Sequence, residues 1–269
     1  MRSRDGGAEQ QKEALVQLIE KITVSLTTFN PMRRFPERGY CESWKEAQGD
    51  EDVYLNHQTF ISGWMESIEQ LHADEILIIE KAEAGKHCMA KRYPWNHVRV
   101  IEAPNDPPFA DPFRQQMLDE AKNDWVLQLD DDERVSPQMA TFLASLGDMD
   151  PAPTKPWAAI RFPREDYIFH KHCWRYIPAN GDDHQMRLLD RRRVKVGSKP
   201  HSIPEPDGAV LTITSRECSI LHYRSFDKIT SWTDNCNRMF AHQPRIVAMQ
   251  TAYVGRVRAM LGIPATAEP

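Results

Sequence analysis

The chain has 269 residues, 41% of them hydrophobic and 27% charged, which excludes a disordered or fibrous protein and fits one α/β domain. Its net charge of −5 argues against a protein that holds nucleic acid mainly by neutralising phosphates, although a local basic patch is compatible with it. No apolar run is long enough to cross a bilayer, and the first 21 residues do not have the pattern expected of a secretory signal. With five widely spaced cysteines read as reduced thiols, we expect a cytoplasmic protein.

The first half of the chain alternates strand-like and helix-like segments. Residues 1–21 predict an N-terminal helical extension, and the polar stretch at 30–56 predicts a long loop. Short β-branched or apolar runs predict strands at 22–28, 76–79, 98–102 and 125–129, and periodic apolar positions predict helices at 60–71, 85–93 and 112–122. This alternation indicates a parallel sheet with right-handed crossovers.

From about residue 151 onward the regular alternation of strands and helices stops. Strand-like runs at 157–162, 184–189, 194–196, 209–213 and 219–223 are separated by loops rich in His, Arg and Asp. Two helices are expected at 225–241 and 244–261. The last helix carries Arg245, Arg256 and Arg258 beside many apolar residues, so we expect it to dock on the body of the protein. The alternative is that it rests on an anionic membrane surface.

Four consecutive acidic residues, Asp130, Asp131, Asp132 and Glu133, follow the strand at 125–129 directly. Their mutual repulsion at a strand end favours a hard divalent cation such as Mn²⁺ or Mg²⁺, which carboxylate oxygens bind well. Ligands of open parallel sheets bind at the carboxyl ends of the strands, where such a cation can bridge two phosphates. The alternative is a solvated acidic turn before a helix that Ser136 caps.

Several ordered motifs resemble family 2 glycosyltransferases, in particular the group of lipopolysaccharide core-sugar transferases. Residues 122–137, KNDWVLQLDDDERVSP, are similar to the family segment GDWVLVLDADERVSP, and residues 27–30 resemble its TxN strand ending. Further elements that resemble PRxNYFLG, DYQLRLF, VHE and LLHY stand at residues 162–169, 183–189, 199–201 and 220–223. The resemblance implies a GT-A fold, which is a Rossmann-like, mostly parallel central sheet flanked by helices, with a smaller antiparallel sheet and C-terminal helices.

The resemblance implies that the protein would be an enzyme that moves a sugar from a nucleoside-diphosphate sugar to an acceptor hydroxyl, with Mn²⁺ or Mg²⁺ and with inversion. A UDP-sugar is the favoured donor, and the acceptor is a glycan, a lipid-linked molecule or another hydroxyl compound, with nucleic acid left open. Residues 22–150 would bind the nucleotide sugar, residues 151–224 would form the acceptor side, and residues 225–269 would form the C-terminal helices. A lipid-linked acceptor would bring the protein to the inner face of the membrane as a peripheral protein.

The resemblance also implies roles for individual residues. Asp183 would be the general base, with Asp182 as the alternative, and Asp132 would bind the metal together with His222 or His201. The donor would be contacted by Thr28, Asn30, Glu80, Arg114, Asp130, Asp131 and Arg187. Two departures from the family stand out, because Glu80 replaces the usual nucleoside-binding Asp and Ser202, not Glu, follows His201. The choice of nucleotide therefore stays open.

Two other functions remain in view. A nucleotidyltransferase of related α/β fold is disfavoured because no glycine-rich basic loop follows the first strand. A non-catalytic module that binds nucleotide or glycan is disfavoured by the presence of Asp130, Asp132 and Asp183 together. The His170–Cys173 segment lacks the second ligand cluster that a structural zinc site requires.

Overall fold

The computed structural model describes residues 22–28, 67–71, 73–82, 96–104, 110–146, 157–170, 173–178, 183–198, 202–239 and 244–264. The expected extension at 1–21, the loop at 30–56 and the helix at 85–93 lie outside these ranges. None of the helices within them has the length and apolar character needed to cross a membrane.

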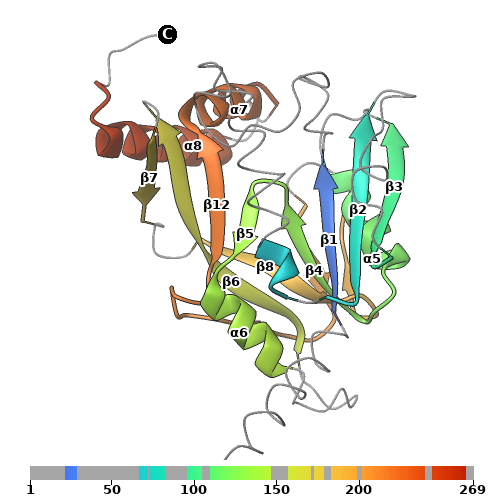
Figure 1. Ribbon diagram of the computed structural model, residues 1–269. Coiled ribbons are helices and arrows are strands. Elements are labelled where there is room, and N and C mark those ends of the chain that lie inside the picture. The colour runs from blue at the N-terminus through green and yellow to red at the C-terminus, as the bar shows by residue number, and fades with distance from the viewer. Residues whose placement is uncertain are drawn as a thin grey trace, which may run out of the picture.

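Strands of one large sheet dominate the described part of the chain (Figure 1). The strands are β1 Ile22–Thr28, β2 Glu75–Ala82, β3 Val98–Pro104, β4 Trp125–Asp130, β5 Glu133–Val135, β6 Trp157–His170, β7 Cys173–Ile177, β8 His184–Asp190, β9 Val194–Lys195, β10 Glu205–Pro206, β11 Ala209–Thr212 and β12 Ile220–Ser225. The helices that lie wholly among the described residues are α5 Asp111–Glu120, α6 Pro137–Leu146, α7 Phe226–Met239 and α8 Pro244–Leu261. All of these strands and helices lie within two or three residues of the expected bounds where a prediction existed, except β6.

The sheet runs in the order β3-β2-β1-β4-β8-β6-β12-β5, and both β7 and β11 pair with β6. Strands β1 to β4 are mutually parallel, as are β6 and β12, whereas β8 is antiparallel to both of its neighbours. The expected α/β class with a mostly parallel central sheet is confirmed. The short antiparallel pair β9 and β10 is separate, while the other antiparallel strands join the large sheet.

The expectation that β6 ends at residue 162 is wrong, because the strand continues to His170. Residues 159–163 pair with β8, and residues 164–169 pair with β12. Pro163 stands where the strand changes partners, and proline, which has no N–H to donate, is tolerated there. One long strand therefore joins the half of the sheet that contains β1 to β4 to the half that carries the C-terminal helices.

Helices cover both faces of the sheet. Apolar side chains alternate along β4, so that Leu127 and Leu129 pack with Met139 and Leu143 of α6, whereas Val126 packs on the other face with Leu118 of α5. Burial of each such side chain stabilises the fold by about 1.5–3 kcal/mol. The predicted cap of α6 is confirmed, since the Met139 N–H donates to Ser136 Oγ at 3.1 Å.

The last two helices lie against the half of the sheet far from β3 (Figure 1). Phe226 and Ile229 of α7 and Val257 of α8 form a buried cluster with Ile168 and Ile177 of the sheet. Docking of α8 on the body of the protein, expected from its apolar residues, is thereby confirmed. The division of the chain at residues 150 and 224 stays a prediction.

Candidate functional site

The acidic turn connects β4 to β5, which lies at the far edge of the same sheet. Strand β4 ends at Asp130, the chain turns at Asp131 and Asp132, and β5 starts at Glu133 and pairs with β12. In the pairing of β12, His222 lies opposite Glu133 on one side and opposite Asp166 of β6 on the other. The Tyr223 N–H donates to the Asp132 carbonyl at 2.7 Å and fixes the turn beside His222.

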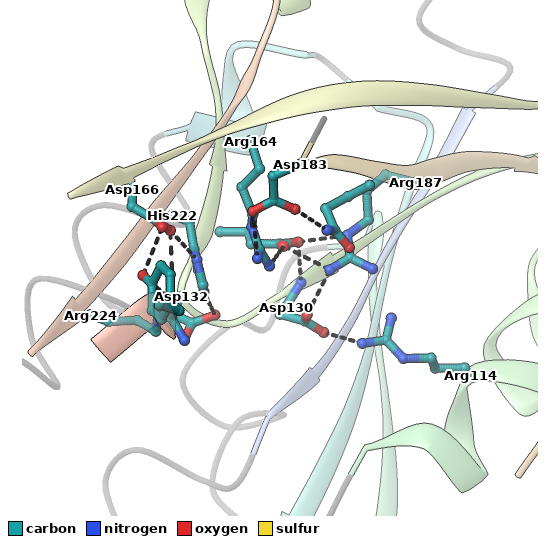
Figure 2. A network of polar contacts seen from close by, with 12 residues as sticks. Arg114, Asp130, Asp132, Arg164, Asp166, Asp183, Arg187, His222 and Arg224 are labelled. Carbon is teal, nitrogen blue, oxygen red and sulfur yellow. Dashed lines mark hydrogen bonds and ion pairs between the residues drawn. The ribbon is translucent and has the colours of Figure 1, made fainter. Parts of the chain in front are cut away.

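Glu133 is the centre of a buried ion network with Arg187 and Arg164. Figure 2 shows these two arginines beside Asp130 and Asp183. Its side chain has no exposed surface, and its two oxygens accept hydrogen bonds from Arg187 Nε at 2.8 Å and Arg187 Nη2 at 2.7 Å. The Asp130 N–H donates to it as well, at 3.1 Å. Arg164 Nη1 lies 3.9 Å from Glu133 Oε1. Glu133 therefore has a structural position inside the sheet and does not belong to a solvated acidic turn.

Asp130 is neutralised by two arginines. Arg114 Nη2 donates to Asp130 Oδ1 at 2.6 Å, and Arg187 Nη2 donates to Oδ2 at 2.8 Å. Burial alone would raise the pKa of Asp130, but the charges of Arg114 and Arg187 hold this pKa below its ordinary value. The expectation that a cation relieves the repulsion among all four carboxylates thus needs correction, because arginines do so for Asp130 and Glu133. Asp132 is the carboxylate of the turn that faces an imidazole.

Asp183 is held just before β8 by donors on both oxygens. Arg164 donates to Oδ2 from Nη2 at 2.9 Å and from Nε at 3.2 Å, and Gln185 Nε2 donates to Oδ1 at 2.6 Å. The side chain is 29% exposed, so solvent and ligands reach it. Burial would lower the pKa of Arg164, but the carboxylates of Asp183, Asp166 and Glu133 raise it, and the guanidinium stays charged. Asp183 is consequently an oriented and accessible carboxylate.

His222 lies between two carboxylates. Burial would raise the pKa of Asp166, but the hydrogen bond from His222 and the nearby arginines hold it well below its ordinary value, so Asp166 is a carboxylate that accepts. The His222 Nδ1–H therefore donates to Asp166 Oδ1, at 2.8 Å. Nε2 then faces Asp132 Oδ1, 3.4 Å away. A carboxylate that orients an imidazole in this manner is the usual support of a metal-binding histidine.

The pair of Asp132 and His222 suits a divalent cation that also takes ligands from its substrate. No group of three or more His, Cys, Asp and Glu side chains suited to a metal exists among the residues that the structure describes. Mg²⁺ and similar ions are commonly held by one or two protein side chains together with substrate phosphates and water. The donor set of one carboxylate and one oriented imidazole therefore fits the cation expected from the sequence.

The structure brings together six of the residues expected from the sequence: Arg114, Asp130, Asp132, Asp183, Arg187 and His222. Thr28 lies opposite Glu80 at the ends of β1 and β2, next to the end of β4, and Glu80 is fully buried. Asp131 lies in the turn and is half-buried. Asn30, Asp182, His201 and the side chain of Thr28 lie outside the described residues.

Arg187 was expected to contact the donor, and its Nε and Nη2 atoms donate to the protein carboxylates of Glu133 and Asp130. Three further residues belong to the site: Glu133, which was expected only as a member of the acidic turn, and Arg164 and Asp166, which were not among the expected site residues. A sequence signal existed for the last two, because they alternate along a run that continues as strand β6. Glu133 carried no such signal beyond its acidic neighbours.

The chain matches no family model and no curated protein. Among solved structures it is similar to S. aureus TarS in complex with UDP, at 12% identity over 60% of this chain and 39% of that chain, with a TM-score of 0.35. TarS in complex with UDP-GlcNAc is 13% identical over 60% of this chain and 38% of that chain, with a TM-score of 0.34. A further S. aureus TarS structure is 10% identical over 89% of this chain and 72% of that chain, with a TM-score of 0.43. The chain thus spans about two fifths of the length of the first two structures.

Proposed function

We propose that this protein is a glycosyltransferase with a GT-A fold that moves a sugar from a nucleoside-diphosphate sugar to an acceptor hydroxyl. The observation that carries the proposal is the grouping of Asp132 in the turn after β4, His222 in β12 and Asp183 just before β8, each held by its own partner. Membership of family 2, and of its lipopolysaccharide core-sugar group, rests on the sequence motifs alone. A UDP-sugar is the donor to be tested first.

Two sets of side chains would share the chemistry: Asp132 with His222, and Asp183. Asp132 and His222 would hold Mn²⁺ or Mg²⁺, which supplies positive charge to the departing diphosphate. Asp166 keeps the Nε2 side of His222 turned toward Asp132. Asp183 takes the proton of the acceptor hydroxyl while the hydroxyl oxygen attacks the anomeric carbon and the bond to the nucleoside diphosphate breaks. A direct displacement of this kind inverts the configuration at that carbon. Arg164 and Gln185 keep the carboxylate of Asp183 in one orientation during that step.

The test is release of nucleoside diphosphate from a panel of UDP-, GDP- and dTDP-sugars and of nucleoside monophosphate from CMP-sugars, with Mn²⁺ or with EDTA. We expect slow hydrolysis of one donor in the wild type and its loss in Asp132→Asn. Asp124→Asn is the matched control, since Asp124 precedes β4, 49% exposed and paired with Arg192. Metal-dependent donor binding without turnover, measured by calorimetry in the presence of a range of acceptors, would favour the non-catalytic binding module instead. Release of pyrophosphate from a nucleoside triphosphate would favour the nucleotidyltransferase.

The exposed side chains of α8 give an indication of the kind of acceptor. Met249 is 65% exposed and Met260 49% exposed, and Arg245, one turn before Met249, is exposed as well. No Asp or Glu occurs between residues 244 and 264, although the chain as a whole is acidic. We infer that this face contacts an anionic lipid surface, as a lipid-linked acceptor would require. Co-sedimentation with phosphatidylglycerol vesicles, but not with phosphatidylcholine vesicles, is expected, and Arg245→Glu should weaken it. Equal sedimentation with both would contradict the inference.

A further inference from the structure

Helix α8 reaches the site through the hydroxyl of one tyrosine. Tyr253 Oη donates to Asp166 Oδ2 at 2.7 Å, across 87 positions of sequence. Arg224 Nη2 donates in turn to Tyr253 Oη at 2.8 Å. Burial raises the pKa of Tyr253, so its hydroxyl keeps the proton that it donates. The hydroxyl has one proton, and it donates this proton in the hydrogen bond to Asp166.

Asp166 is held at both of its oxygens and is almost fully buried. Oδ1 accepts from His222 Nδ1 at 2.8 Å, and Oδ2 accepts from Tyr253. A carboxylate bonded at one oxygen rotates about its terminal torsion, whereas donors at both oxygens fix its plane. The plane of Asp166 then sets the direction of the His222 ring and hence of Nε2 toward Asp132.

The tyrosine ring is packed independently of its hydroxyl. Its aromatic face lies 5.4 Å from the guanidinium carbon of Arg224 and 5.4 Å from that of Arg256. It also packs against the buried cluster that contains Val257 of the same helix. Phenylalanine would keep these apolar and cation–π contacts. The hydroxyl is thus separable from the docking of α8.

We propose that Tyr253 is a positioning residue that fixes Asp166 and, through it, the metal-facing nitrogen of His222. Helix α8 is then part of the active site and not only a cover for the sheet. The role of the metal in this inference rests on the proposed function, but the hydrogen-bonded chain from Tyr253 to His222 does not.

The first test uses the metal-free protein with Tyr253→Phe. Hydrogen exchange of the His222 Nδ1–H, followed by nuclear magnetic resonance, should become about tenfold faster, as expected when a buried charge-assisted hydrogen bond is lost. Tyr176→Phe is the matched control, because Tyr176 Oη donates at 2.5 Å to Glu165, the residue next to Asp166 on the opposite face of β6. Exchange should be unchanged in that control. An unchanged rate in Tyr253→Phe would overturn the proposal.

The second test measures Mn²⁺ binding in the presence of UDP by electron paramagnetic resonance. We expect Tyr253→Phe to bind about tenfold more weakly, which is the lower end of the effects of outer-shell partners. Val257→Ala loosens the packing of α8 without touching the hydroxyl, so an equal loss in that variant would overturn the positioning role. If the wild type bound no Mn²⁺, the proposed metal site would fail, while the exchange measurement would still decide the role of Tyr253.

Discussion

Replacing Glu133 with glutamine removes the negative charge at the centre of the buried ion network while keeping the size of the side chain. In the wild type, Glu133 accepts two hydrogen bonds from Arg187 and one from the Asp130 N–H, and none of its surface is exposed. A glutamine offers one acceptor oxygen and places an NH₂ group against a donor. The buried guanidinium of Arg187 and the partly buried guanidinium of Arg164 then have one carboxylate fewer to neutralise them.

Loss of one partner of a buried ion pair destabilises a protein by about 3–5 kcal/mol. Asp130 and Asp183 continue to neutralise the two arginines, so the lower end, about 3 kcal/mol, is expected here. For a chain of this length each kcal/mol lowers the melting temperature by about 2 °C. The variant should therefore melt about 6 °C below the wild type.

Urea denaturation at pH 7 measures this difference in the free energy of unfolding. Glu165→Gln is the matched control, because Glu165 is also buried but accepts one hydrogen bond from Tyr176, and its other charged neighbour, Arg216, is half-exposed at 3.8 Å. It should cost less than about 1 kcal/mol. A loss in Glu133→Gln no larger than that of the control would refute the assignment of Glu133 as the centre of the network.

Three other predictions concern separate parts of the molecule. Asp183→Asn should lower kcat at least about 100-fold with donor affinity unchanged by calorimetry, and normal turnover would move the base elsewhere. Gly208→Ala should lose about 1–3 kcal/mol in urea denaturation, because Gly208 has a φ of +142° and a Cβ there would overlap the guanidinium of Arg193. Gly255→Ala, in open space within α8, should instead gain about 0.5–1 kcal/mol, and losses at both positions would contradict this reasoning. Burial raises the pKa of the Cys218 thiol from 9.0 to about 11, so on raising the pH the thiol ionises first in the unfolded state. The free energy of unfolding of the wild type should therefore fall, relative to that of Cys218→Ala, as the pH rises from 9 to 11. Unfolding curves at pH 8 and 10 test this, and a constant difference would speak against a buried thiol.

Local signals in the sequence were sufficient for most of the fold. Strand β4 and the cap of α6 follow from a short apolar run and from Ser136 before Pro137, and both depend only on neighbouring residues. The extent of β6 did not follow, because Pro163 is typical of a strand end. The strand continues only because β12, distant in sequence, replaces β8 as its partner.

The partners within the site were less predictable than its members. Asp132, Asp183 and His222 belong to recognisable motifs, but Glu133 meets Arg187 across 54 positions and His222 meets Asp166 across 56. Such pairs depend on which strands become neighbours and in which register. A single sequence does not contain that information in any local pattern.

The pleat of β6 has a consequence for how this protein can vary. Arg164, which supports Asp183, and Asp166, which supports His222, are two residues apart on one face of the strand, or about 6.6 Å. Inserting one residue between them would turn Asp166 to the face of Glu165 while Arg164 stayed in place. Length changes in this segment therefore disconnect the two supports, whereas substitutions leave their spacing intact. Among homologous chains we expect this stretch to differ in residue identity and to keep its number of residues.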